Sequence, residues 1–186
     1  MHLRTTLLSA SAQLDTFSVG VAAARSLQEG GEAMALPQPG EMHRWLATHH
    51  GTWDCKVEGA MGESTATWAS EAGPGGLWNL GRFRGDMMGM PFEGHEVLGY
   101  DPGSETFTSV WVDSWTTAPM ILEGSYDATA RRLVMRGEMP GPDGTPVPAK
   151  HVTSYPDDDT MVFSMHGPGP DGPESELMKI TYTRRE

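Results

Sequence analysis

Apolar and polar residues alternate with a period of two through most of the chain from Thr52 onward. This period is typical of strands that bury one face. Near the end of the chain, for example, Met178, Ile180 and Tyr182 share one face and polar residues occupy the other. The alternation predicts ten strands, over residues 52–61, 64–71, 77–86, 92–100, 106–115, 120–126, 131–138, 147–155, 160–166 and 176–185.

Segments rich in Gly, Pro and Asp separate these strands, as at 74–76, 101–103, 142–144 and 156–159. Such segments form tight turns. Short strands joined by tight turns, with no helices between them, indicate an antiparallel meander. We therefore predict an all-β fold, an up-and-down barrel of about 8–10 strands, because closure leaves no strand edge unpaired. A sandwich of two sheets is the alternative.

A helical period occurs ahead of the strands. Met42, Trp45, Leu46 and His49 recur at positions i, i+3, i+4 and i+7, which predicts a short amphipathic helix over 41–50. A helix of this length is not stable alone in water. We expect it to dock on an apolar surface and to cap one end of the barrel.

The first residues differ in composition from the rest, being rich in Ala, Ser and Thr and free of Trp. We expect a flexible N-terminal extension over 1–36 and a barrel domain over 37–186. Arg4 followed by the apolar stretch 7–12 resembles a signal peptide, but the stretch is too short and too rich in Ser and Thr. We therefore expect a cytoplasmic protein, with export as the alternative.

The 186-residue chain carries a formal net charge of −12. Nucleic acids and anionic membranes attract basic surfaces, so we expect neither as a partner. No apolar run approaches the roughly 20 residues that a membrane helix needs. The single cysteine, Cys55, excludes an internal disulfide. The sequence also lacks a P-loop, a dinucleotide fingerprint and a Gly-x-Ser-x-Gly motif.

The dry faces of the predicted strands would form the interior of a barrel, and many of the 13 methionines belong to them. Eight strands already leave room for one small ligand, and flexible methionine suits a lining that adapts to a guest. We predict a protein that binds a small apolar or aromatic molecule in a Met- and Trp-lined cavity. The expected ligand-binding residues are Trp111, Trp115, Met120, Met135, His151, Met161, Phe163 and Tyr182. The alternative is that the methionines fill a collapsed core.

The hairpin after Tyr100 supports a second hypothesis. If Tyr100 pairs with Thr106, Glu93 lies opposite Asp113 on one face, with His95 beside them. A histidine beside a carboxylate is a general base with a fixed tautomer, and paired carboxylates raise the pKa of one of them. Such a cluster would suit a cofactor-independent isomerase, cyclase or hydrolase. The alternative is that these side chains face water.

Several motifs resemble a known family. They are GTW at 51–53, PFEGHEVLGYDP at 91–102, WVDS at 111–114 and MKITYTRR at 178–185. Together they resemble the uncharacterised domain-of-unknown-function family 1579, over roughly residues 42–185. The resemblance implies a lipocalin-related (calycin-like) barrel without an established activity.

The resemblance also implies how one barrel end is closed. In lipocalin-like barrels the tryptophan of a Gly-x-Trp motif closes an end, and a basic residue of the last strand lies across it. Trp53 and Arg184 match these positions. A guanidinium over an indole contributes about 0.5–2 kcal/mol.

We expect no metal and no cofactor, because the histidines lack the dense spacing of motifs such as His-x-Glu-x-x-His. Barrels of this size hold haem on one histidine in the nitrobindins, so haem is the alternative, and His151 shares a face with Val147 and Tyr155 that could point inward. A further alternative is a filled barrel whose exposed tryptophans form a homodimer face.

Overall fold

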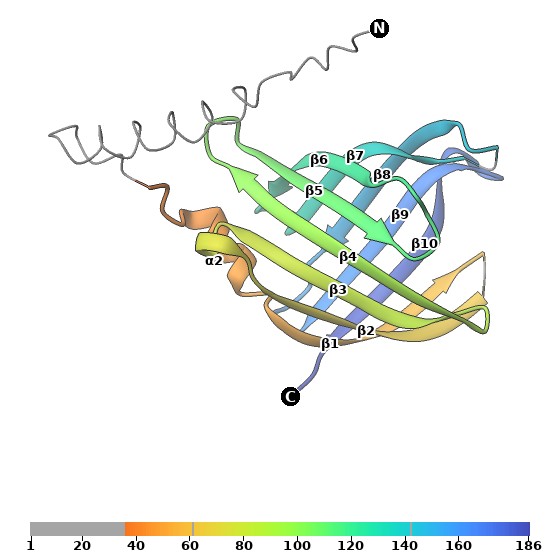
Figure 1. The fold of residues 1–186 in the computed structure, drawn as a ribbon, viewed down its shortest axis with the longest axis horizontal. Helices are drawn as coiled ribbons and strands as arrows, with labels where there is room; N and C mark the ends of the chain where they lie inside the picture. Colours follow the sequence, from red (N-terminus) through yellow and green to blue (C-terminus); the bar gives the residue numbers. More distant parts are fainter. Residues whose placement is uncertain (1–35, 61, 142) are drawn as a thin grey trace, which may run out of the picture. The chain divides into compact units, whose positions relative to one another are not determined.

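The computed structural model describes residues 36–60, 62–141 and 143–186, so the predictions for residues 1–35 lie outside the described part of the chain. Within that part, ten strands form one closed antiparallel barrel (Figure 1). This confirms the predicted all-β barrel and excludes the two-sheet sandwich. The strands are β1 (Gly51–Gly59), β2 (Gly62–Ala72), β3 (Trp78–Met87), β4 (Met90–Asp101), β5 (Thr106–Asp113), β6 (Met120–Asp127), β7 (Arg132–Pro140), β8 (Pro146–Ser154), β9 (Thr160–Gly169) and β10 (Gly172–Arg184).

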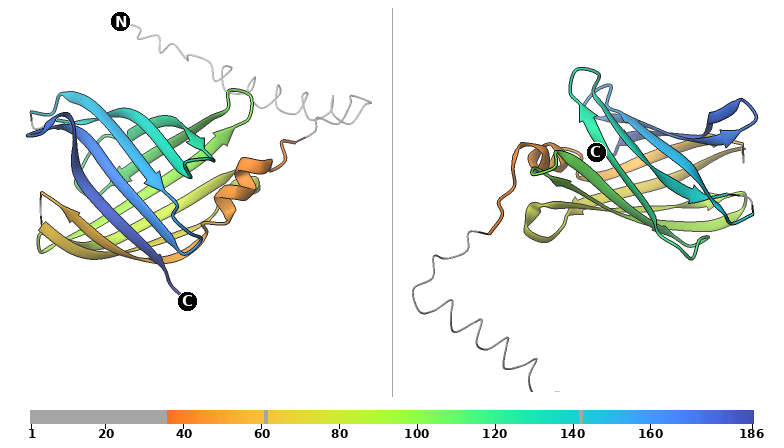
Figure 2. Two further views of the ribbon diagram at one scale, coloured as in Figure 1. Left: turned by 180° about the vertical axis from the view of Figure 1, so that it is seen from behind. Right: turned by 90° about the horizontal axis from the view of Figure 1, so that it is seen from above.

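Each strand pairs with its neighbours in sequence, and β1 pairs with β10 to close the wall (Figure 2). In this closing ladder Trp53 lies opposite Arg184, and Val57 lies opposite Ile180. A short 3₁₀ turn, η1 (Pro74–Gly76), connects β2 to β3. Every observed strand overlaps one predicted strand, because a wall with one dry face imposes the period of two on each of them.

The helix α2 (Glu41–Ala47) covers one end of the barrel (Figures 1 and 2). It is shorter than the predicted helix over 41–50, because it ends at the cap residue Thr48. Leu46 is buried in the core. Trp45 packs on aromatic rings of the barrel, with its ring centroid 4.1 Å from that of Tyr126 and 5.1 Å from that of Tyr155. The amphipathic pattern thus docks the helix as expected.

A buried histidine fixes α2 to the wall. The ring of His43 accepts a hydrogen bond at Nδ1 from the backbone N–H of Gly40 (3.0 Å). Its Nε2–H donates to the carbonyl oxygen of Tyr100, at the end of β4 (3.0 Å). Because a carbonyl can only accept, this pair of bonds defines a neutral ring protonated at Nε2.

The C-terminal end of α2 is held by side chains of the first and last strands. The guanidinium of Arg184 donates to the carbonyls of His50 (3.0 Å) and Thr48 (2.9 Å). Its Cζ atom lies 4.1 Å from the ring centroid of Trp53, whose indole N–H donates to the carbonyl of His49 (3.2 Å). These bonds satisfy the carbonyls of the cap residue Thr48 and of the two residues after it, and a positive charge is also favourable near a helix C-terminus.

The interior is densely packed at some levels of the barrel and open at others. Trp53, Phe107 and Leu122 are the largest side chains that are fully buried. No helix in the described ranges is long and apolar enough to cross a membrane.

Candidate ligand-binding cavity

The barrel contains an internal cavity of about 360 Å³. At one end it is bounded by Leu46 and His49 beside α2, and at the other by residues such as Trp115, which is 40% exposed. Small-molecule sites usually have volumes of roughly 300–1,000 Å³. Side chains therefore leave an interior space of the size that a small ligand needs.

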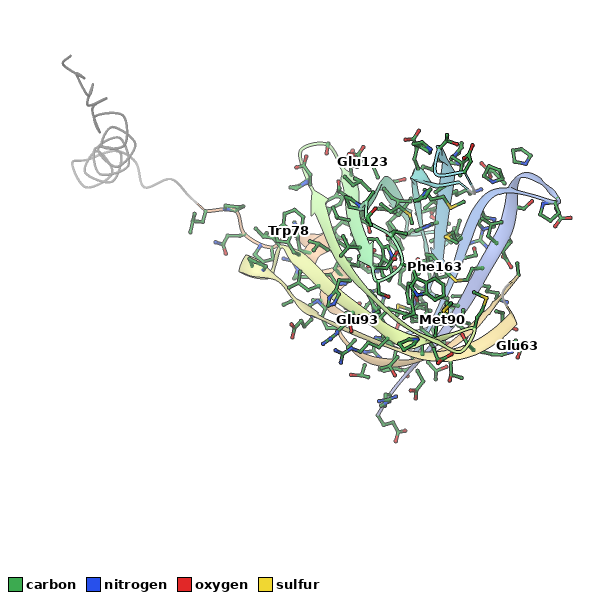
Figure 3. All side chains as sticks on the ribbon, turned by 45° about the vertical axis from the view of Figure 1, so that its right-hand side comes forward. Glu63, Trp78, Met90, Glu93, Glu123 and Phe163 are labelled. Atoms are coloured by element: carbon green, nitrogen blue, oxygen red, sulfur yellow. The ribbon has the colours of Figure 1, made fainter. Side chains whose placement is uncertain are left out.

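The structure places all eight of the predicted ligand-binding side chains in the lining of this cavity. They are Trp111, Trp115, Met120, Met135, His151, Met161, Phe163 and Tyr182. Figure 3 shows Phe163 inside the barrel and Glu93 on the outer side of the wall. The alternation of apolar and polar residues therefore predicted correctly which positions of these strands face the interior.

The predicted register of the β4–β5 hairpin is wrong by one residue. Tyr100 pairs with Phe107, and Asp101 pairs with Thr106. The Asp101 carboxylate accepts the backbone N–H of Gly103 (2.9 Å) and closes a tighter turn than expected. A shift of one residue turns one strand of the hairpin over, so that its side chains exchange faces.

The shift separates Asp113 from the other two residues proposed for catalysis. Glu93 lies on the outer wall, where its carboxylate accepts hydrogen bonds from Arg82 (2.6 Å), Arg84 (3.2 Å) and His95 Nε2 (3.0 Å). His95 therefore does not line the cavity, whereas Asp113 does. The expected cluster of His95, Asp113 and Glu93 is not formed.

Glu96, which the sequence analysis did not propose, faces the cavity in place of Glu93. Its Oε1 atom accepts a hydrogen bond from the Ser109 hydroxyl at 2.6 Å, and both residues line the cavity. Burial raises the pKa of Glu96, because its charged form is poorly solvated there. The aromatic residues Tyr100 and Phe107 could have indicated the correct register, because two large rings favour the same dry face. In the structure their ring centroids lie 4.7 Å apart.

Two histidines add neutral imidazoles to the lining. Burial lowers the pKa of His151 to about 4, and burial likewise lowers the pKa of His49 to about 4. His49 Nδ1–H donates to the carbonyl of Trp45 (3.1 Å). Among the described residues, His151 Nε2 has no hydrogen-bond partner. That nitrogen is free to exchange a hydrogen bond with a ligand.

The indole of Trp111 forms part of the cavity wall. It lies against the backbone of Gly94, where an added Cβ atom would come within 2.1 Å of the ring. Asp113 holds the indole in place by accepting its N–H (2.9 Å), and it also accepts the backbone N–H of Trp115 (2.8 Å). The Asp113 carboxylate is therefore engaged in positioning the aromatic wall.

Replacing Gly94 with Ala is expected to displace the Trp111 indole and to lower the free energy of unfolding by about 1–3 kcal/mol, because the ring has no space to share. The indole N–H signal of Trp111 in an NMR spectrum reports the displacement, since it would lose its bond to Asp113. The control is His95→Ala, which alters the next residue on the outer face. An unmoved indole signal in Gly94→Ala would contradict this packing.

Other reactive groups offer little chemistry. Burial raises the pKa of Cys55 to about 12, so its thiol is a poor nucleophile. Within the described ranges, no group of three or more His, Cys, Asp or Glu residues lies close enough together to hold a metal ion.

The lining fits only one part of haem. His151 supplies a buried neutral imidazole that could bind iron. The porphyrin carboxylates, however, would find no Lys or Arg among the described lining residues, which instead include Glu96 and Asp113. The residues therefore do not fit the whole group, and haem has no part in the function proposed below.

The fold and the cavity define the class of protein. It is a closed ten-stranded antiparallel barrel whose internal cavity is large enough for a small ligand. The chain belongs to the family described as "Protein of unknown function (DUF1579)", whose model matches residues 38–184. This confirms the resemblance seen in the sequence motifs. A search of curated proteins finds no significant match.

Solved structures with similar folds include Rv2717c from M. tuberculosis, with a TM-score of 0.61 and 13% identity, covering 79% of this chain and 99% of that chain. They also include mFAP1, a redesigned β-barrel bound to DFHBI, with a TM-score of 0.41 and 13% identity, covering 75% of this chain and 97% of that chain. The first likeness shows the fold alone, and the second is too low to support an argument. The relation to lipocalins stays a prediction.

Proposed function

We propose that this protein binds a small apolar or aromatic molecule inside the barrel. The observation that supports this most is the cavity of about 360 Å³, lined mainly by apolar and aromatic side chains with a few polar groups among them. A largely apolar pocket with a few convergent polar groups is the usual form of a small-molecule site.

The size of the cavity also argues for a functional role. Side chains around an interior volume of this size lack packing contacts that a filled core would give them. Methionines such as Met135, Met161 and Met178 contribute to the lining and adapt easily to the shape of a guest. A ligand would restore the contacts that the free barrel lacks.

The ligand would enter at the end opposite α2. The helix end is held by Arg184, Trp53 and His43 through the hydrogen bonds described above. At the other end the lining includes Trp115 and Thr116, which belong to the exposed connection between β5 and β6. The cluster of His95, Asp113 and Glu93 on which the enzyme hypothesis depended is not formed, because His95 and Glu93 lie on the outer wall.

Replacing Met135 with Trp is expected to abolish binding of the neutral fluorescent probe N-phenyl-1-naphthylamine, because the larger side chain fills the cavity. Fluorescence titration measures the affinity, and we expect a loss of at least tenfold. The matched control is Val134→Trp, which adds the same side chain on the opposite face of β7 and should leave binding unchanged. Failure of the unmodified protein to bind the probe, or equal binding by both variants, would count against an internal site.

A further inference from the structure

The ionisable groups that could carry charge around the cavity at neutral pH are acidic. The described lining residues include two carboxyl groups, Glu96 and Asp113, and no Lys or Arg. The two lining histidines, His49 and His151, have lowered pKa values and are uncharged near neutral pH. An anionic ligand such as a fatty acid would therefore meet like charge and no counter-ion, whereas a cation would meet an acidic interior.

Within the described part of the chain, the buried Glu96 has no basic partner, unlike Glu93 and Glu174 on the outer wall. Glu93 on the outer wall binds two arginines and a histidine, and Glu174 binds Arg136 (3.0 Å) and Lys150 (2.6 Å). Among the described residues, no basic side chain lies within 4.0 Å of the Glu96 carboxyl, whose single hydrogen bond comes from Ser109. Acidic side chains deep inside proteins are rarely unpaired. A cationic ligand would supply the counter-charge that favours the ionised form of Glu96.

Two indoles flank Glu96 on the inner wall. On β5 its cross-strand partner is Trp111. On β3 its partner is Gly81, and an added Cβ atom at that glycine would come within 1.9 Å of the Trp68 ring. The Trp68 ring therefore lies over Gly81, the neighbour of Glu96 on β3. Trp111 is the neighbour of Glu96 on β5.

Tyr182 extends this aromatic surround. Its ring centroid lies 6.3 Å from that of Trp68, in a T-shaped arrangement. Burial is the main cause that raises the pKa of Tyr182, and the charges of Cys55 and Glu96 add smaller contributions. A carboxyl group in a cavity that also contains tryptophan and tyrosine rings matches the chemistry that recognises organic ammonium ions, since ring faces attract cations.

We propose that the ligand of this cavity is an organic ammonium ion, a primary to quaternary amine with an aromatic or aliphatic body. Its cationic head lies between Trp68 and Trp111 against the Glu96 carboxylate, and its apolar body lies against the methionines. The protein's net charge of −12 favours the approach of such a ligand. This inference rests on the proposed function and names the ligand class of the same site.

The test compares three naphthalene compounds that differ mainly in charge. They are 2-naphthylmethylamine, which is a cation at neutral pH, the neutral 2-naphthylmethanol and the anionic 2-naphthoate. Titration calorimetry measures their affinities for the full chain. We expect the amine to bind at least tenfold more tightly than the alcohol, and the carboxylate to bind most weakly.

The variant Glu96→Gln keeps the shape of the side chain and removes its charge. We expect it to lower the affinity for the amine at least tenfold and to leave the affinity for the alcohol within about twofold. The matched control is Glu93→Gln, which removes the same charge from the outer wall of the same strand and should change neither affinity. Circular dichroism checks that both variants are folded.

The outcomes separate the two proposals. If no compound of the three binds and N-phenyl-1-naphthylamine also fails to bind, the proposed function is wrong. If the alcohol binds as well as the amine, or if Glu96→Gln keeps the full preference for the amine, the cavity binds ligands but the inference about the ammonium ion is wrong. The wild-type series alone gives this answer even if Glu96→Gln fails to fold.

Discussion

Replacing Arg184 with Ala is expected to lower the free energy of unfolding by about 3 kcal/mol. The side chain, which is 27% exposed, joins three parts of the barrel end. It donates to the carbonyls of Thr48 and His50 after α2, it packs over Trp53 of β1, and it binds the Asp159 carboxylate before β9 at 3.0 Å. Its loss would leave helix-end carbonyls without a protein donor. Urea unfolding followed by circular dichroism measures the change.

The neighbouring arginine supplies a matched control. Arg185 pairs with Asp54 on the protein surface, and exposed pairs of this kind contribute little to stability. Arg185→Ala should therefore change the unfolding midpoint much less than Arg184→Ala. Equal effects of the two variants would mean that loss of positive charge, and not the contacts at the barrel end, explains the result.

Acidification is expected to destabilise the barrel through the two histidines that line the cavity, His49 and His151. Burial lowers the pKa of His49 and of His151 from 6.5 to about 4 in the folded state. Between these values the unfolded chain binds more protons, so the stability that is present above pH 6.5 is lost as the pH falls towards 4. Each histidine should contribute about 2 kcal/mol of this loss between pH 7 and pH 5, and the pair about 4 kcal/mol.

The variant His151→Gln tests this assignment. Its unfolding free energy should fall by about 2 kcal/mol less than that of the wild type between pH 7 and pH 5. Glu96, whose raised pKa acts in the opposite direction, is present in both proteins and cancels in the comparison. The control is Val152→Ala, a non-titrating change at the next residue, which should keep the wild-type pH dependence. The same pH dependence in His151→Gln and in the wild type would contradict the burial of a neutral imidazole.

The fold followed from the sequence because one physical constraint acts on all ten strands. Each strand has one face towards the dry interior, and that face repeats every second residue, as Met161 and Phe163 show on β9. Most turns carry Gly, Pro or Asp where the chain reverses direction. These local signals, taken together, leave a closed meander as the arrangement without exposed edges.

The candidate site could be predicted from the sequence only in part, because the register between paired strands depends on the geometry of the turn that joins them. Lining residues such as Met135 and Tyr182 depend on alternation within a strand, which a sequence displays directly. Glu96 depends on how Asp101 closes the turn to Thr106, and a change of one residue there decides whether Glu93 or Glu96 faces inward. Residue identity alone does not separate two glutamates three positions apart.

The packing of tryptophan rings on glycines also could not be predicted from the sequence. Gly81 and Gly94 are unremarkable in a chain with 23 glycines. Their importance appears only when Trp68 and Trp111 are seen to occupy the space that a Cβ atom would need. Both pairs join neighbouring strands, so the contact is set by register and not by local sequence.

The ladder between β1 and β10 also sets the order in which the protein can mature. It pairs Asp54 with Thr183, and beside it the side chains of Asp54 and Arg185, 131 positions apart, form a hydrogen bond. Until β10 has left the ribosome, β1 and β9 present free edges, and the nascent sheet exposes its future interior to water. Contacts this distant in sequence make folding slow, so the window for aggregation or chaperone capture lasts at least until β10 has been synthesised.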